Sequence, residues 1–202
     1  MTFNCKKYLE KYIDETITSL NEIKTKYAEQ ILQIVDTLLA ARDRGHLIFL
    51  MGNGGSASTA SHFAGDLNKG ALPSMHTRRR FRAISLNDNI PLMLAWANDS
   101  CYDNIFIEQL KNMLNEGDIV IGISGSGESK NILQALEYAN AHGALTIGFT
   151  GRYRGRVGKI CKVAKICLVV PAERMEQIED MHLLIEHLII TMIREKESHS
   201  EF

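Results

Sequence analysis

Two short loops rich in glycine and serine carry the residue types best suited to bind a phosphate. The first, Gly52–Ser56, and the second, Ser124–Ser129, each follow an apolar run and precede a helical pattern. Glycines let the backbone approach an anion closely, serine hydroxyls donate to it, and a helix that begins there directs unpaired N–H groups toward it. The candidate phosphate-binding residues are Asn53, Gly54, Gly55, Ser56, Ser124, Gly125, Ser126 and Ser129.

Two other interpretations of these loops are weaker. Serine and glycine also form ordinary turns and helix caps, and an N-cap is the better account of Ser129 taken alone. The run that begins at Gly52 resembles the start of a dinucleotide-binding GxGxxG motif, but Ala57 and Ser58 follow where the third glycine is needed. A dinucleotide site also has no use for a second serine-rich loop, whereas phosphate binding explains both loops.

A second group of polar residues is suited to bind a metal or to move a proton. His62 and Asp66 are four residues apart and share one face of a helix. Near the C-terminus, an otherwise apolar helical pattern contains Glu179, Asp180, His182, Glu186 and His187. Two carboxylates and two histidines suit zinc or another divalent metal, and a carboxylate with a histidine equally suits proton transfer next to a carbonyl. A single histidine is more often a hydrogen-bonded packing residue.

These residues require a scaffold that brings loops and helices together. Apolar strands are expected over 47–51, 81–86, 118–124, 145–150 and 166–170, alternating with helices. Strands that are apolar throughout favour a parallel sheet covered on both faces, in a single doubly wound α/β domain of the flavodoxin-like type. Residues 45–202 form this core, which ends in a long helix over 176–197. Residues 1–44 form two N-terminal helices, over 3–22 and 27–44, either as extra cover for one sheet edge or as an arm for a second subunit.

Composition excludes several classes of function. The net charge is −1 over 202 residues, and no apolar run approaches the ~20 residues of a membrane span. We therefore expect no nucleic-acid partner and no membrane partner. Four cysteines without a CxxC pair are expected to be reduced packing residues in a cytoplasmic protein. The basic segment Gly151–Lys159 fits a solvated loop, a sugar-phosphate contact or a subunit contact.

At these motifs the chain resembles the SIS (sugar isomerase) domain family, and within it the phosphoheptose isomerases. The resemblance rests on NGGSAS and SHFAGDL within 53–67, AISLNDN at 83–89, AWANDSCYDNIF at 95–106, GDIVIGISGSGESKNILQALEYA at 117–139, GALTIGFTG at 143–151 and MEQIEDMHLLIEHLI at 175–189. These segments span nearly the whole chain after the N-terminal helices.

The resemblance implies a cytoplasmic homotetramer that isomerises sedoheptulose 7-phosphate for heptose synthesis, with one zinc ion per subunit. It implies that the serines of the two loops hold the phosphate and that Asp88 and Glu176 lie beside the sugar hydroxyls. Asp66 stands at the position of the catalytic base and His187 at that of the acid. The implied zinc ligands are His62, Asp66, Glu179 and His187.

Two positions depart from the family pattern. Asp66 replaces a glutamate, which shortens the base by one methylene, and Glu179 replaces a glutamine, which adds a negative charge to the metal set. The paired changes suggest a retuned site. Other SIS proteins bind phosphosugars as regulators or act as scaffolds without isomerase activity, and that alternative stays open, although a scaffold needs neither His62 nor His187.

Overall fold

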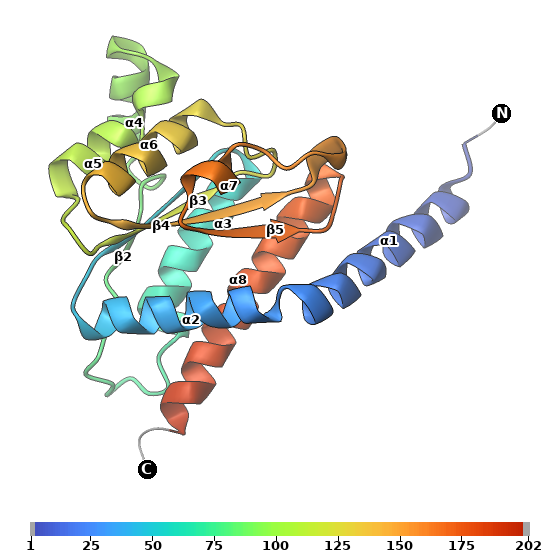
Figure 1. The fold of residues 1–202 in the computed structure, drawn as a ribbon, viewed down its shortest axis with the longest axis horizontal. Coiled ribbons are helices and arrows are strands. Elements are labelled where there is room, and N and C mark those ends of the chain that lie inside the picture. Colours follow the sequence, from blue (N-terminus) through green and yellow to red (C-terminus); the bar gives the residue numbers. More distant parts are fainter. Residues whose placement is uncertain (1–2, 200–202) are drawn as a thin grey trace.

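A five-stranded parallel sheet stands at the centre of the computed structural model, which describes residues 3–199 (Figure 1). The strand order is β2-β1-β3-β4-β5, and all neighbouring strands are parallel. The strands are β1 (Ile48–Gly52), β2 (Ala83–Ser85), β3 (Ile119–Ile123), β4 (Leu145–Gly151) and β5 (Ile166–Val170). This order confirms the predicted fold class, and its switch point lies between β1 and β3, where such sheets bind ligands.

Helices cover both faces of the sheet. They are α1 (Cys5–Lys26), α2 (Ala28–Asp43), α3 (Gly55–Gly65), α4 (Ile90–Asp99), α5 (Ile107–Met113), α6 (Lys130–Ala141), α7 (Ile160–Val163) and α8 (Met175–Ser198). Ile48 and Leu50 of β1 join the core formed with α2, α3 and α8, whereas Phe49 and Met51 join the core formed with α5 and α6. Because both faces are buried, β1 is apolar throughout. None of the described helices is long and apolar enough to cross a membrane.

Three element boundaries differ from the sequence-based expectation. β2 is limited to Ala83–Ser85 because it is an edge strand that pairs with β1 over three residues only. The first N-terminal helix, expected over 3–22, continues to Lys26, and a 3-10 turn, Tyr102–Asn104, precedes α5. After α3 the backbone continues as a π-helical turn, Asp66–Gly70, so Asp66 stands at a change of helical pitch.

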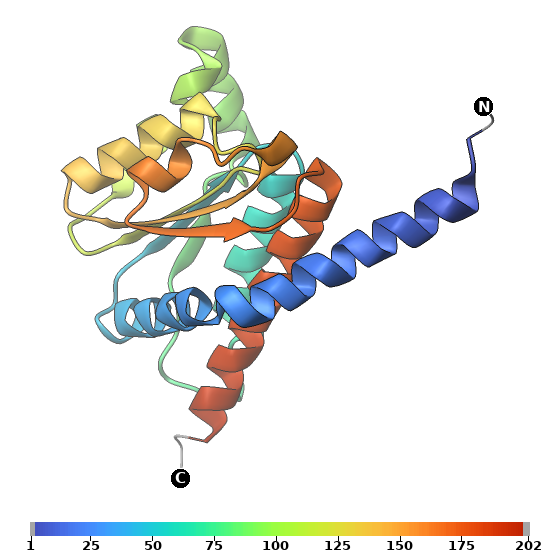
Figure 2. The ribbon, with the colours of Figure 1, turned by 45° about the vertical axis from the view of Figure 1, so that its right-hand side comes forward.

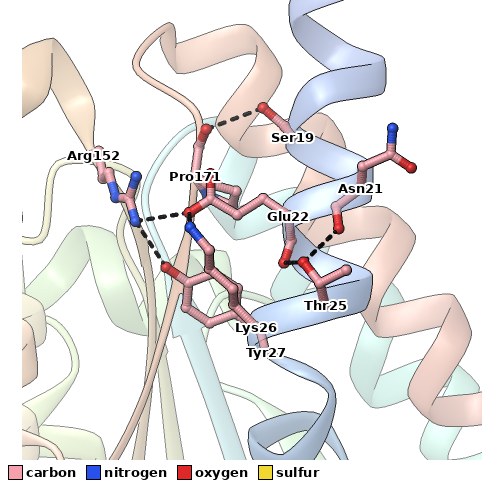
Figure 3. Close-up of polar contacts among 8 residues, drawn as sticks. All are labelled: Ser19, Asn21, Glu22, Thr25, Lys26, Tyr27, Arg152 and Pro171. Carbon is pink, nitrogen blue, oxygen red and sulfur yellow. Dashed lines mark hydrogen bonds and ion pairs between the residues drawn. The ribbon is translucent and has the colours of Figure 1, made fainter.

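Helix α1 extends away from the sheet as an arm (Figures 1 and 2). Only Ser19 and Ile23 of its 22 residues are buried. Ser19 Oγ donates a hydrogen bond to the Pro171 carbonyl at 3.0 Å, which fixes the second half of the arm to the end of β5 (Figure 3). The first half therefore projects beyond the body of the subunit.

Arg152, in the basic segment, also holds the arm in place (Figure 3). Its Nη2 atom donates to Glu22 Oε1 at 3.1 Å and to the Tyr27 hydroxyl at 3.0 Å, at the junction of α1 and α2. Further along the segment, Lys159 forms an ion pair with Glu128 at 3.2 Å. These two cations of the segment therefore have protein partners.

A disulfide joins Cys161, in α7, to Cys167, in β5. The prediction that all cysteines are reduced is wrong for this pair, while Cys5 and Cys101 are free and exposed. The spacing of the two bonded cysteines matches no recognised motif. Their contact depends on α7 folding back beside β5, which the sequence pattern does not reveal.

We expect thiol alkylation of the denatured, unreduced protein to modify two cysteines, and alkylation after reduction to modify four. Replacing Cys161 with serine should lower the melting temperature, because closing a loop of this size stabilises a protein by roughly 2 kcal/mol. Cys101→Ser, at an exposed free cysteine, is the matched control and should melt like the wild type. Modification of all four cysteines before reduction would contradict the disulfide.

His182 is a polar residue that lies inside the core. Its side chain is fully buried beneath β4, with its ring 5.9 Å from the ring of Phe149, and neither ring nitrogen has a hydrogen-bond partner. Burial lowers the pKa of His182 to about 4 from an ordinary value of 6.5. The histidine is therefore a neutral packing residue at neutral pH.

This burial predicts an acid-sensitive contribution to stability. Between pH 6.5 and 4 the unfolded chain binds a proton at His182 that the folded chain does not, so stability falls as the pH is lowered through this window. The full effect is about 3 kcal/mol, at about 1.4 kcal/mol for each pKa unit. In denaturant titrations from pH 7 to pH 4, the wild type should therefore lose more unfolding free energy than His182→Leu. Comparing the two proteins cancels the opposite contribution of Glu186, whose pKa is raised. A difference in unfolding free energy that does not change with pH would contradict the lowered pKa of His182.

Candidate active site

The first glycine loop connects the end of β1 to the start of α3. Gly54 adopts a φ of 56°, in the left-handed region that glycine tolerates, and stands at the N-cap of α3. A Cβ atom on Gly52 would collide with the Ser56 backbone, so this tight turn requires glycine there. Ser56 is buried at the first turn of α3. The local geometry is that of an anion-binding helix start.

The second loop is held in shape by its own serines. Ser124 Oγ accepts a hydrogen bond from the Gly127 amide at 3.1 Å and lies 3.0 Å from Ser129 Oγ, and Ser126 Oγ accepts from the Glu128 amide at 3.3 Å. Ser129 occupies the N-cap position of α6 but makes no capping hydrogen bond. The N-cap interpretation of Ser129 therefore holds for its position and not for its side chain, which faces Ser124.

Reciprocal amide hydrogen bonds join the two loops. Asn53 Nδ2 donates to Asn131 Oδ1 at 3.0 Å, and Asn131 Nδ2 donates to Asn53 Oδ1 at 2.9 Å. The Tyr102 hydroxyl donates to Asn53 Oδ1 at 2.8 Å. Sequence reasoning missed Asn131 and Tyr102, although Asn131 stands only two residues after Ser129 of the serine loop and its position was a usable signal. The Asn53–Asn131 pair fixes the distance between the two candidate phosphate loops.

The predicted histidines and Asp66 come together where α3 and α8 lie side by side. His62 Nε2 is 3.2 Å from His187 Nε2, and their rings meet edge to face with centroids 4.9 Å apart. His62 Nε2 is also 3.5 Å from Asp66 Oδ2. His62 and His187 are about half exposed, so this cluster opens to the surface.

Glu186 completes the cluster from its buried side. One potential ligand atom each from His62, Asp66, Glu186 and His187 lies within 4.8 Å of all the others. The Glu186 side chain is fully buried, neither carboxylate oxygen has a hydrogen-bond donor, and Oε2 is 3.4 Å from His187 Nε2. Burial, followed by the neighbouring Asp66 carboxyl, raises the pKa of Glu186 to about 8. An unpartnered buried carboxylate beside two imidazoles is a donor set that fits a divalent metal ion.

Glu179, predicted as a metal ligand, lies elsewhere. It is not part of this group, because its carboxylate lies against Gly55 at the start of α3, where a Cβ atom would collide with it. Burial, followed by the charges of Glu176 and Asp180, raises the pKa of Glu179. Glu176 is exposed in the first turn of α8.

Asp88 lies after β2, in a polar hollow of about 570 Å³ beside α3. Its Oδ1 atom accepts a hydrogen bond from Ser61 at 2.5 Å, and Ser61 Oγ is 3.1 Å from Ser85 Oγ. Ser61 directly precedes His62 in α3. Asp88 is therefore connected to the same helix as the cluster, without a contact to its members in the described structure.

Comparison with known proteins agrees with this arrangement. The SIS domain pattern matches residues 11–151. The phosphoheptose isomerase of Aliarcobacter butzleri is 38% identical over 186 residues, covering 92% of this chain and 93% of the relative. Solved phosphoheptose isomerases from Francisella tularensis (TM-score 0.85, 26% identity, 96% of this chain and 100% of that one) and Neisseria gonorrhoeae (TM-score 0.83, 27% identity, 94% and 98%) share the fold. The chain therefore belongs to the SIS domain family.

Proposed function

We propose that the chain is a phosphosugar aldose–ketose isomerase that converts sedoheptulose 7-phosphate to D-glycero-D-manno-heptose 7-phosphate through an enediol. One observation carries the proposal: the first phosphate loop begins α3, the second lies against the start of α8 at Gly125, and the His62–Asp66–His187 cluster lies further along the same two helices. Relatives of similar length that are named phosphoheptose isomerases supply the substrate class.

The spacing along α3 matches a long sugar. His62 follows Gly55 by seven residues, which is about 10 Å along the helix axis at 1.5 Å per residue. In an extended seven-carbon sugar phosphate C2 and C1 lie roughly 8 and 10 Å from the phosphorus, since each bond adds about 1.2 Å of projected length. A phosphate bound at the start of α3 thus places the reacting carbons beside the cluster.

The side chains can then perform the two proton transfers of an isomerisation. Asp66 takes the proton from C1, next to the C2 carbonyl, while His187 gives a proton to the carbonyl oxygen, which yields the enediol. Return of a proton to C2 and loss of the O1 proton produce the aldehyde at C1. The distant phosphate contacts supply binding energy that holds these carbons in register with the two residues.

A zinc ion is the metal that we propose for this site. His62, Asp66 and His187 would hold it, and when bound it would polarise the substrate oxygens and stabilise the charge of the enediolate. The residues themselves orient the sugar and exchange its protons. In this proposal the shortened Asp66 side chain reaches the site from the π-helical turn rather than from regular helix.

We also propose that the subunits form a homotetramer through the arm. Helix α1 exposes the apolar side chains Leu9, Ile13 and Ile17. Beside it, an apolar groove of about 340 Å³ between α1, α2 and α8 is lined by residues that include Leu32, Leu184 and Leu188. Leu188 directly follows His187, so a second subunit seated on this groove lies next to the site.

Replacing His187 with alanine should abolish most turnover. Loss of a positioned acid typically costs between about 10²- and 10⁴-fold in rate. The measurement is conversion of sedoheptulose 7-phosphate by the purified protein, followed as aldose formed. The matched control is His142→Ala, an exposed histidine that stacks on Tyr138 in α6, which should retain wild-type activity. Absence of turnover in the wild type would favour a phosphosugar-binding regulator or scaffold.

The phosphate loop can be tested separately with Gly127→Ala. Gly127 has a φ of 67°, and a Cβ atom there would lie 2.8 Å from Thr150 Oγ1 and 2.9 Å from the Gly158 Cα. Strain of this kind displaces the loop, and we expect KM for the sugar phosphate to rise about tenfold with a smaller change in kcat.

Gly143→Ala is the control for backbone strain. Gly143 has a φ of 76° in the turn between α6 and β4, at the opposite end of the strands from the loops. Its substitution should lower stability and leave KM unchanged. An equal rise of KM in both variants would contradict the phosphate-binding role of the 124–129 loop.

A further inference from the structure

We infer that a hollow lined by arginines is a binding site for a small ligand that carries two or more adjacent phosphate groups. The hollow has a volume of about 520 Å³ and lies between the end of α2 and the segment that precedes β2. We call it the arginine hollow, because five of its seven lining residues are arginines: Arg42, Arg44, Arg78, Arg79 and Arg80. The whole chain has a net charge of −1, so this concentration of positive charge does not follow from its composition.

The arginine hollow lies away from the candidate active site. Gly45, which lines it, precedes β1, and the carbonyl of Arg82, just before β2, accepts a hydrogen bond from the Ile48 amide at 2.9 Å. The hollow is therefore at the amino ends of these two strands, whereas the glycine–serine loops follow the carboxyl ends of β1 and β3. A ligand bound there does not compete with a sugar phosphate, so the inference is independent of the proposed function.

The segment before β2 holds its arginines in place without a ligand. Four of the five residues 78–82 are arginines, and the fifth, Phe81, is buried and fixes the segment to the core. Arg82 Nη1 donates to the Gly45 carbonyl at 2.8 Å, which joins the segment to the turn after α2. Arg80 donates from Nε and Nη2 to two carbonyls of its own segment, at 2.9 and 2.8 Å. Because the backbone is already held, less conformational entropy is lost when a ligand binds.

The positive charge of the arginine hollow is only partly balanced. The buried Arg42 side chain pairs with Asp43 and with Glu197, each at 2.9 Å, and Asp43 also lies 3.8 Å from Arg79 Nη1. In the described part of the chain no other carboxylate lies within ion-pair distance of the five arginines, so three positive charges are left over. Two adjacent phosphate groups carry about three to four negative charges at neutral pH, which matches this excess.

Arg44 and Arg78 are free to bind such a ligand. Both side chains are exposed, line the hollow, and form no hydrogen bond or ion pair with any of residues 3–199. A guanidinium group is a planar fork of donors that binds two phosphate oxygens at once. Like charges that share one hollow repel each other, and a bound chain of phosphates removes this repulsion while it occupies the unused donors.

Two other roles explain the arginines less well. Arginines at the end of a helix can neutralise its last carbonyls, but the turn after α2 satisfies carbonyls of the last helical turn with its own backbone amides. Surfaces for single-stranded nucleic acid combine cations with aromatic side chains on which bases stack, and no aromatic residue of the described chain lines this hollow. A concave, mainly cationic lining fits a compact chain of phosphates.

The test measures binding of inorganic tripolyphosphate to the full-length protein by isothermal titration calorimetry, in a buffer that contains a metal chelator. We expect the double variant Arg44→Gln/Arg78→Gln to bind about 100-fold more weakly than the wild type, at roughly tenfold for each charge-assisted contact. The matched control, Lys162→Gln/Lys165→Gln, removes two exposed charges next to β5. It should bind within about twofold of the wild type, because salt screens distant surface charges.

Two further measurements separate binding from folding and from catalysis. Without ligand, both double variants should melt like the wild type, since substitutions of exposed side chains change stability little. Conversion of sedoheptulose 7-phosphate should be the same in Arg44→Gln/Arg78→Gln as in the wild type. Failure of the proposed reaction and failure of this site are therefore separate results.

Each outcome decides the inference. Tripolyphosphate binding that depends on Arg44 and Arg78 supports it, and a parallel titration with ATP identifies the source of the phosphates: a nucleotide if ATP binds more tightly, a free polyphosphate if it does not. A wild type that does not bind tripolyphosphate overturns the inference, as do equal losses in the two double variants or inorganic phosphate that binds as tightly as tripolyphosphate. A single-stranded oligonucleotide that binds through the same arginines more tightly than ATP also overturns it and assigns the surface to nucleic acid.

Discussion

The close packing of α3 against α8 is the constraint on which the candidate site depends. One end of this contact places the Glu179 carboxylate over Gly55, where no side chain fits. The other end brings His62 and His187 to 3.2 Å. A side chain at position 55 would displace the Glu179 carboxylate from its place at the start of α3. Gly55 of the phosphate loop therefore leaves the space that the Glu179 carboxylate occupies.

The same helix pair places polar groups where a stable core would not have them. His182 and Glu186, one turn apart on α8, are both fully buried without hydrogen-bond partners. His182 remains neutral and contributes packing, so its cost is small at neutral pH. Glu186 is held in its protonated form at neutral pH, because burial and the neighbouring Asp66 carboxyl raise its pKa to about 8. Proteins commonly tolerate a destabilising arrangement of this kind where it serves the site.

Sequence reasoning reached the fold and much of the site, for physical reasons that are visible in the residues. Apolar strands alternating with helices define a parallel sheet, and glycine–serine loops after β1 and β3 must meet at its switch point. The four-residue spacing of His62 and Asp66 placed them on one helix face. The resemblance then located His187, and the structure brings the three together.

The remaining features depend on contacts that no local pattern encodes. Glu186 is one of several polar residues in an apolar helix, and its place beside His62 and Asp66 distinguishes it from Glu179, which lies at the start of α3. Asn131 and Tyr102 act through partners far away in the chain. The Cys161–Cys167 bond requires α7 to fold back beside β5. Each of these is a tertiary contact, whereas periodicity and spacing report only on neighbours along one element.

The arm has a consequence for the local dynamics of the subunit. The two buried residues of α1, Ser19 and Ile23, lie in its second half. The turns before Tyr12 have few tertiary contacts to add to their intrinsic helical stability, which is marginal for a segment of this length. Their backbone amides therefore belong to the least protected class in hydrogen exchange, with an opening free energy far below that of global unfolding. Association that covers the arm adds to this free energy by mass action. In the proposed homotetramer, the exchange rates at residues 5–11 would therefore depend on protein concentration, while those of the sheet would not.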